Sequence, residues 1–259
     1  MGHPWPEGDS VINARDWRTY VAVFHTERAG IAEDVLEHAL DVDGLTAYDW
    51  AAQPVPPGSL VLDLACGSSP MHSRLGALRY LGLDLSPAEL ALASARAVSV
   101  AQADAARLPL ADGVLDAVVM SMALMLVPLP TTLAEVTRVL RPGGVFVATV
   151  PTSRPLPRSD WIRYARLCWA LRNQGLTYPN DQALAVPGPV FAAASMTLRS
   201  DEARTFRFEV STQHDADQLL ASLYLPDVQP DRMDAGRRVV RRWVGSHVTT
   251  PIRRLVATV

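Results

Sequence analysis

The stretch that decides the fold is Val61-Leu62-Asp63-Leu64-Ala65-Cys66-Gly67-Ser68-Ser69-Pro70. Its first four residues, three apolar ones and a carboxylate, are typical of a short buried strand. The small residues that follow predict a tight turn, and Pro70 with Ser69 before it predicts the first position and the cap of a helix. A buried strand that passes through small residues into a helix suits a nucleotide-like ligand, because such a ligand can then approach the backbone and the free amides at the helix start.

Strands and helices alternate along the chain after this stretch. Two helix starts, Ser86-Pro87-Ala88-Glu89 and Thr132-Leu133-Ala134-Glu135, carry the capping box, in which Ser or Thr is followed three positions later by Glu. Strands are expected at residues 60–64, 79–84, 98–102, 115–120, 145–150, 205–210 and 252–259. Because strands separated by helices pair in parallel, this order predicts an α/β fold, a Rossmann-like, doubly wound and mostly parallel sheet.

Two segments stand outside this alternation. Residues 1–57 predict helices from about residue 14, at 31–40 and at 45–51, followed by a proline-rich hinge. This prelude is either a flap that packs on the sheet or a lid over the ligand site. Residues 151–203 are rich in Pro and Arg, with one helix near 160–172. The predicted organisation is an N-terminal helical lid over 1–57 and a Rossmann-like domain over 58–259 with a substrate-binding insertion at 151–203.

Composition narrows the classes of function. Of 259 residues 49% are hydrophobic, which suffices for a core, yet no apolar run reaches the roughly 20 residues of a membrane span. The N-terminus lacks a basic start and an apolar signal segment, so we expect a cytoplasmic protein without a membrane partner. A formal charge of -3 gives no overall attraction to nucleic acid. All 24 basic residues are Arg, which excludes Schiff-base chemistry and a phosphate-loop lysine. The two cysteines, Cys66 and Cys168, have no metal-binding spacing, and no metal site is expected.

Polar side chains follow the ends of four predicted strands. Asp63 ends the first strand, and Asp84 ends the second, 21 positions later, where a carboxylate can bind both hydroxyls of a ribose. Asp104-Ala105 follows the third strand and suits the edge of an adenine. Ser121 follows the fourth, beside backbone that suits a polar tail. Because ligands of open parallel sheets bind outside the carboxyl ends of the strands, these residues predict one shared site.

These motifs resemble those of class I S-adenosylmethionine-dependent methyltransferases. The segments that carry the resemblance are Val61–Gly67, Gly82–Ser86, Ala103–Ala105 with Leu108-Pro109, Asp116–Val119 and Leu140–Gly144. The branch resembled is the small-molecule one, similar to ubiquinone-biosynthesis methyltransferases, over about residues 58–150 and in outline over the last two strands. The resemblance implies a seven-stranded sheet whose last strand is antiparallel. It also implies S-adenosylmethionine as cofactor and S-adenosylhomocysteine as product.

Carried over position by position, the resemblance implies a complete cofactor site. Asp63, Ala65 and Gly67 shape the methionine pocket, Asp84 binds the ribose, Leu85 packs on the adenine, Asp104 and Ala105 read the adenine edge, and Ser121 lies near the methionine amino group. From the prelude, Tyr20 is expected to contact the cofactor. Two departures stand out: Ala65 and Ser69 occupy positions where the family usually has glycine, and the stretch Ala123–Leu126 lacks the histidine that many relatives carry there.

The implied chemistry is an in-line displacement at a methyl group on a sulfonium, in which closeness and orientation supply much of the acceleration. Because the histidine after the fourth strand is missing, a proton acceptor must come from elsewhere, or the acceptor needs none. His25 on the first helix and His214 after the sixth strand are the candidate bases.

The acceptor pocket is expected from the prelude and the insertion, with an aromatic lining of Trp17, Trp161, Tyr164, Trp169 and Tyr178. An aromatic stripe at helical spacing is also typical of a core. The arginines of residues 237–242 are either a solvated helix face or a patch for a phosphate-bearing or carrier-bound substrate.

The sequence therefore predicts a methyltransferase for a small, apolar or aromatic acceptor, acting as monomer or homodimer. The alternative is a protein of the same fold that binds S-adenosylmethionine without methyl transfer, such as a natural-product cyclase or a binding protein. A nicotinamide-dependent oxidoreductase would need Gly-x-Gly-x-x-Gly after the first strand, where only Gly67 is present. An RNA methyltransferase is disfavoured by the acidic charge balance.

Overall fold

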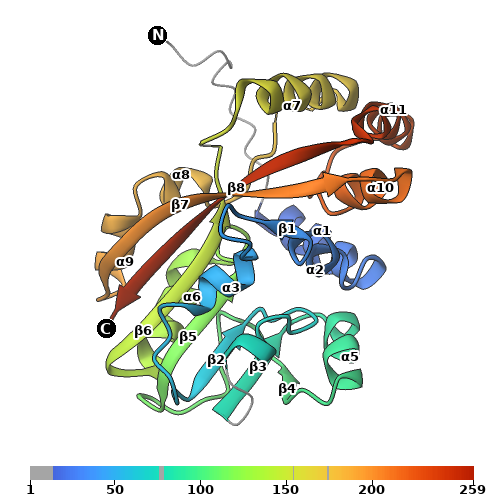
Figure 1. Cartoon of the computed structure of the whole chain (residues 1–259). Coiled ribbons are helices and arrows are strands. Elements are labelled where there is room, and N and C mark those ends of the chain that lie inside the picture. The colour runs from blue at the N-terminus through green and yellow to red at the C-terminus, as the bar shows by residue number, and fades with distance from the viewer. Residues whose placement is uncertain (1–13, 76–78, 154, 174) are drawn as a thin grey trace.

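A computed structural model describes residues 14–75, 79–153, 155–173 and 175–259, with the side chains of 14–16 excepted. Its eight-stranded sheet has the order β1-β7-β8-β6-β5-β2-β3-β4 (Figure 1). The strands are β1 (Ala39–Leu40), β2 (Val61–Leu64), β3 (Tyr80–Asp84), β4 (Val100–Gln102), β5 (Leu115–Ser121), β6 (Leu140–Pro151), β7 (Thr197–Val210) and β8 (Ser246–Thr258). β2 to β6 pair in parallel, whereas β8 runs antiparallel between β6 and β7. The predicted fold class and the antiparallel last strand are confirmed.

The sheet has one strand more than the seven expected. The helix predicted over 31–40 ends at Leu36, and Ala39 and Leu40 then pair antiparallel with Phe208 and Arg207 of β7. This pairing satisfies backbone groups at the sheet edge, which a helix continued to residue 40 would leave open. The described part of residues 1–57 thus contributes a strand to the main sheet, and its separation as a lid domain stays a prediction.

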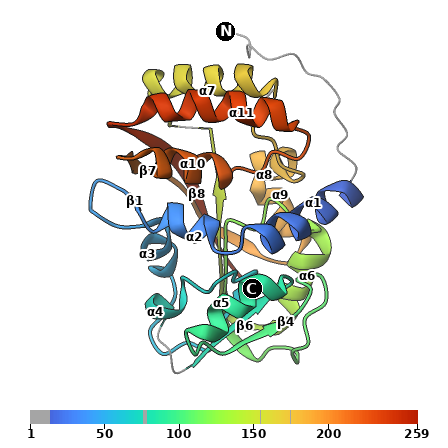
Figure 2. The ribbon, with the colours of Figure 1, turned by 90° about the vertical axis from the view of Figure 1, so that its right-hand side faces the viewer.

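Helices cover both faces of the sheet (Figures 1 and 2). They are α1 (Ala14–Glu27), α2 (Ile31–Leu36), α3 (Ala47–Ala52), α4 (His72–Leu75), α5 (Pro87–Ala95), α6 (Leu129–Val139), α7 (Arg158–Leu171), α8 (Asp181–Ala185), α9 (Pro187–Ala193), α10 (Gln213–Ala221), α11 (Pro230–Val240) and the 3₁₀ turn η2 (Arg241–Trp243). Successive residues of β5 alternate between the two core layers: Val119 packs in the layer with α2, α3 and α7, and Val118 in the layer with α6 and α9. A central strand buried on both faces explains the continuous apolar run in its sequence.

Two predicted helix starts are wrong. α4 begins at His72, because Ser69 adopts a positive φ of 67° and remains in the turn instead of capping the helix. α6 begins at Leu129, three residues before Thr132, so Thr132 lies buried within the helix, and Glu135 accepts a hydrogen bond from the Leu108 amide, 2.7 Å away. Ser86 does cap α5, accepting from the Glu89 amide.

Candidate functional site

The turn after β2 adopts a conformation that favours small residues. Ala65, Gly67 and Ser69 have φ values of 56°, 54° and 67°, in the left-handed region where side chains are disfavoured. Gly67 donates its amide to Asp84 Oδ2 at 2.8 Å, which joins the turn to the end of β3. Gly82 on β3 allows the turn to pack there, since a Cβ at this position would lie 2.9 Å from Cys66 Sγ. The turn therefore presents its backbone beside the Asp84 carboxylate.

Two carboxyl groups predicted at the strand ends lie beside this turn, Asp63 buried and Asp84 partly buried. Asp63 is 1% exposed and accepts a 2.6 Å hydrogen bond from the Tyr80 hydroxyl. Burial raises its pKa to about 7, and the neighbouring Asp84 adds to the shift. Asp84 accepts from the amides of Ser86 and Gly67, yet burial still raises its pKa. Buried acidic groups in such a place favour a ligand that carries positive charge.

The predicted adenine-reading positions lie at the next strand end. Asp104 accepts from the Ala106 amide at 2.9 Å, and with Arg18 of α1 it forms an ion pair of 2.5 Å; both contacts lower its pKa. Ala105 beside it is partly buried, and the Leu85 side chain is 44% exposed next to Asp84. Thus Arg18 of the prelude contacts a carboxylate that the resemblance assigns to the cofactor.

The fourth predicted strand end is hydrogen-bonded to the neighbouring strand β6. Ser121 Oγ lies 3.1 Å from Thr149 Oγ1 of β6, and the Met122 amide donates to the Thr149 carbonyl at 2.9 Å. Met122 itself has a φ of 55°. Asn180 of the insertion donates to the carbonyls of Leu124 and Val127, both at 2.8 Å, so the insertion lies over the segment after β5. This segment is the one that lacks the family's histidine.

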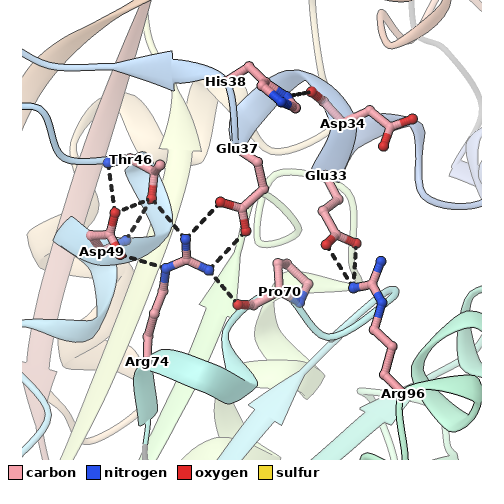
Figure 3. A network of polar contacts seen from close by, with 9 residues as sticks. All are labelled: Glu33, Asp34, Glu37, His38, Thr46, Asp49, Pro70, Arg74 and Arg96. Carbon is pink, nitrogen blue, oxygen red and sulfur yellow. Dashed lines mark hydrogen bonds and ion pairs between the residues drawn. The ribbon is translucent and has the colours of Figure 1, made fainter.

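An ion-pair network holds α2 and α3 over the turn (Figure 3). Arg74 of α4 forms a two-pronged contact with Glu37, at 2.9 and 2.7 Å, and bonds Asp49 Oδ1 at 2.6 Å. Arg96 binds Glu33 at 2.7 and 3.0 Å, and the Ser68 hydroxyl donates to the same carboxylate. Because Ser68 belongs to the turn, this network joins the prelude directly to the predicted methionine pocket.

The α1 helix places an aromatic cluster beside the same strand ends. Trp17, Tyr20 and Phe24 pack with Tyr178 of the insertion and Tyr224, with ring centroids 4.5–6.5 Å apart. The Tyr20 hydroxyl accepts from the Leu225 amide at 2.7 Å. Trp17 and Tyr20, the two prelude residues predicted to touch a ligand, therefore lie within one cluster.

His25 connects two groups that sequence analysis did not assign to the site. Its Nδ1 lies 2.8 Å from Glu89 Oε1, and its Nε2 lies 2.9 Å from the Tyr224 hydroxyl. Glu89, buried at 3% exposure, also accepts from the Gly30 amide at 3.1 Å. Burial raises the pKa of Tyr224, and the Tyr178 and Glu89 charges add to this shift. The motif at residues 86–89 predicted only a helix cap for Glu89, and no local pattern marks Tyr224, 199 positions from His25.

A cavity of about 1550 Å³ adjoins this cluster. Tyr224 and Met122 form part of its wall, and Trp161 and Tyr164 of α7 line it, whereas Trp17 does not, so the acceptor pocket stays a prediction. His214 is not brought to it: the residue is exposed in the first turn of α10, beside Asp215 and Asp217. Among the described residues no cluster of His, Cys, Asp and Glu could hold a metal ion, and both cysteines are free and buried.

The strand order, with β2, β3 and β4 side by side, is the Rossmann-like arrangement predicted for the methyltransferase fold, and Asp63, Asp84 and Asp104 lie at or just after the carboxyl ends of these strands. Residues 62–148 match the family model described as a methyltransferase domain. Over this segment the chain is similar to demethylmenaquinone methyltransferases.

Several known proteins are similar to parts of the chain. A demethylmenaquinone methyltransferase of Mycolicibacterium paratuberculosis is 40% identical over 38% of this chain and 44% of its own length. An uncharacterized chloroplastic methyltransferase of Arabidopsis thaliana is 38% identical over 40% of this chain and 34% of its own. The chain thus matches less than half the length of these relatives. Among solved structures, the [4+2]-cyclase SpnF aligns with a TM-score of 0.58 at 18% identity, over 92% of this chain and 94% of that one.

A chain from the complex between the Haloferax volcanii Trm112 methyltransferase activator and a methyltransferase aligns with a TM-score of 0.57 at 19% identity, over 92% of this chain and 96% of that one. At these identities both structures support the fold alone. Within the part of the chain that the structure describes, no helix is long and apolar enough to cross a membrane.

Proposed function

We propose that this protein transfers the methyl group of S-adenosylmethionine to a small-molecule acceptor with an apolar or aromatic body. One observation carries the proposal: the carboxyl ends of β2, β3 and β4 gather Asp63, Asp84 and Asp104, and Met122 and Tyr224 join this edge to the large cavity. A cofactor edge beside a separate acceptor cavity is the arrangement that a group transfer between two bound molecules requires.

The residues at the strand ends fit S-adenosylmethionine. The turn of small residues with positive φ admits a ligand close to the backbone. The buried Asp63 and the partly buried Asp84, both with raised pKa values, suit a cationic ligand. When bound, the cofactor supplies a methyl group on a positively charged sulfur with a good leaving group. The chain would hold it through the turn residues Ala65 and Gly67, through Asp84 and Leu85 at the nucleoside, through Asp104 and Ala105 at the adenine edge, and through Ser121 at the amino group.

The cavity supports an acceptor with a sizeable apolar body. Its volume of about 1550 Å³ exceeds the roughly 300–1,000 Å³ typical of small-molecule pockets. Residues of its wall include Met122, Met125, Leu176 and Leu223 together with aromatic side chains. The curated relatives are named for demethylmenaquinone, which makes a quinone-like acceptor the first to be tested here.

Tyr224, His25 and Glu89 are suited to remove a proton from the acceptor. A carboxylate oxygen accepts, so we assign Nδ1 of His25 as the donor to Glu89, which leaves Nε2 to accept from the Tyr224 hydroxyl. Because the pKa of Tyr224 is raised, its phenol stays protonated. The phenol oxygen can take the proton of a hydroxyl on the bound small molecule while its own proton passes to His25. This arrangement replaces the histidine missing after β5.

Calorimetry and mass spectrometry test the proposal together. We expect the full chain to bind both S-adenosylmethionine and S-adenosylhomocysteine. Incubation with S-adenosylmethionine and demethylmenaquinone, followed by a panel of phenols and catechols, should yield a product heavier by one methyl group in place of a hydrogen. Failure to bind either cofactor form would reject the proposal. Binding without a methylated product across the panel would favour the alternative of a cofactor-binding protein or cyclase.

A further inference from the structure

The outward face of α7 carries large apolar side chains and arginines together. Trp161 and Ile162 are each 47% exposed and Trp169 is 84% exposed, and the arginines beside them are exposed as well. Spacings of three, four and seven residues place all of these side chains on one side of the helix. This α7 face consists of Arg158, Trp161, Ile162, Arg166, Trp169 and Arg172.

The opposite side of α7 is packed firmly, so the exposed face is presented by an anchored helix. Leu167, Cys168 and Leu171 are buried there. Gly236 of α11 lies so close that a Cβ at that position would be 2.6 Å from Leu171. Figures 1 and 2 place α7 at one outer end of the molecule, with α11 alongside it. An indole exposed to this extent on a rigid surface helix requires an explanation other than packing.

Charge is concentrated at this end of the molecule. Residues 158–172 and 230–243 hold nine arginines and three aspartates, a net charge of +6, within a chain whose total is -3. The rest of the chain therefore sums to -9. Arg158, Arg166 and Arg172, with Arg238 and Arg242 of the neighbouring helix end, are exposed and have no ion-pair partner among the described residues. A surface of this kind attracts a polyanionic partner.

We propose that the α7 face docks the protein on the surface of an anionic lipid bilayer. Tryptophan side chains favour the headgroup region of a membrane, and arginines beside them bind lipid phosphates. A second copy of this chain fits less well, because two such faces would oppose each other with like charges. The proposal does not depend on the proposed function, since docking requires neither cofactor nor acceptor.

The cavity explains what such docking would achieve. Trp161 and Arg172 belong to the α7 face and also line the cavity, so the cavity adjoins the proposed lipid contact. An apolar acceptor dissolved in the bilayer would enter it without crossing water. The prediction of no membrane partner depended on the absence of an apolar span and of an N-terminal signal segment. Peripheral docking requires neither, because it depends on one local surface.

Vesicle sedimentation with the full chain tests the proposal. We expect binding to vesicles of phosphatidylcholine mixed with phosphatidylglycerol, weaker binding to phosphatidylcholine alone, and a loss of binding as salt is raised. The double substitution Ile162→Ser with Trp169→Ser should lower the partition coefficient by about tenfold or more. Arg158→Gln and Arg166→Gln should each lower it about fivefold.

Matched controls separate docking from general changes. Val42→Ser and Val186→Ser alter apolar residues that are 87% and 66% exposed elsewhere, and they should bind vesicles like the wild type. All variants should have the circular dichroism spectrum and the cooperative thermal unfolding of the wild type, which shows that they are folded. Equal binding to neutral and anionic vesicles, or unchanged binding of the Ile162/Trp169 variant, would overturn the proposal. So would sedimentation that shows a dimer dissociated by the same substitutions and no vesicle binding.

Discussion

The proposed cofactor half of the site and the proposed acceptor half are held together by contacts that span very different distances along the sequence. In the cofactor half, Gly67 bonds Asp84 and Tyr80 bonds Asp63, in both cases across 17 residues. In the acceptor half, His25 meets Tyr224 across 199 residues and Tyr20 meets Leu225 across 205. The first half can be built by one β-turn-α unit and its neighbour, whereas the second forms only when both ends of the chain have packed. Substitutions in the two halves should therefore change different measured quantities.

The largest expected effect tests the acceptor half. Tyr224→Phe removes the hydroxyl that bonds His25 Nε2, and His25→Gln removes the ring, so either should lower kcat by about 10²–10⁴-fold for an acceptor that loses a proton. Cofactor affinity by calorimetry should stay nearly unchanged. Tyr178→Phe is the matched control, since it removes a hydroxyl from the same aromatic cluster. An equal loss of kcat in that control would show that packing, and not proton transfer, is affected.

The next prediction concerns stability in the cofactor half. Burial raises the Asp63 pKa to about 7 in the folded protein from its ordinary value of 3.8, so the folded state retains a proton that the unfolded chain has lost. Stability should fall as pH rises from about 4 to about 7, and at about 1.4 kcal/mol per pKa unit the loss reaches up to about 4 kcal/mol. Asp63→Asn still accepts a hydrogen bond from Tyr80 but does not ionise. It should therefore be more stable than the wild type at about pH 7.5 and similar to it at about pH 4. Urea unfolding at both pH values measures this.

Glu135→Gln is a control variant whose effect on stability at neutral pH should be opposite to that of Asp63→Asn. Arg138 and the Leu108 amide lower the pKa of Glu135 to about 2, so its stabilisation is present at neutral pH and is lost as pH falls through the acid range. At neutral pH the free energy of unfolding should rise in Asp63→Asn and fall in Glu135→Gln. If both variants lost stability at neutral pH, Asp63 would be ionised in the folded protein, and burial would not keep its carboxyl group protonated.

A smaller effect is expected for direct cofactor contact. Asp84→Ala removes the carboxylate assigned to the ribose and also the acceptor of the Gly67 amide, so affinity for S-adenosylhomocysteine should fall by about tenfold or more. Asp84→Asn retains one accepting oxygen and should lose less. Asp112→Ala, at a side chain 80% exposed outside the site, should leave calorimetric affinity unchanged. Wild-type affinity in Asp84→Ala would remove Asp84 from the cofactor site.

The contrast between the halves also explains how far sequence could predict the molecule. Strand periodicity and the residues Asp63, Asp84 and Asp104 are local signals; the fold that they predicted is confirmed, and the cofactor site that they predicted stays a prediction. Glu89 satisfied a local capping pattern, but its carboxylate is drawn away to His25 and Gly30 by tertiary packing. Residues 39–40 lie within a predicted helix, yet pairing with β7 overrides that local preference. Tyr224 carries no local signal, because its role arises only from α1 packing against the segment after α10.

The smallest expected effect tests a direct contact between the halves. Arg18, whose side chain is 59% exposed, pairs with Asp104 Oδ2, and this oxygen is the one left free by the Ala106 amide to read an adenine. An exposed pair contributes at most about 1 kcal/mol, so Arg18→Gln should tighten S-adenosylhomocysteine binding about two- to fivefold, and less at high salt. Arg107→Gln changes the same charge at an exposed position nearby and should have no such effect. Weaker binding in Arg18→Gln would instead make this ion pair a latch that closes the prelude over the cofactor, and the two halves would then act as one unit.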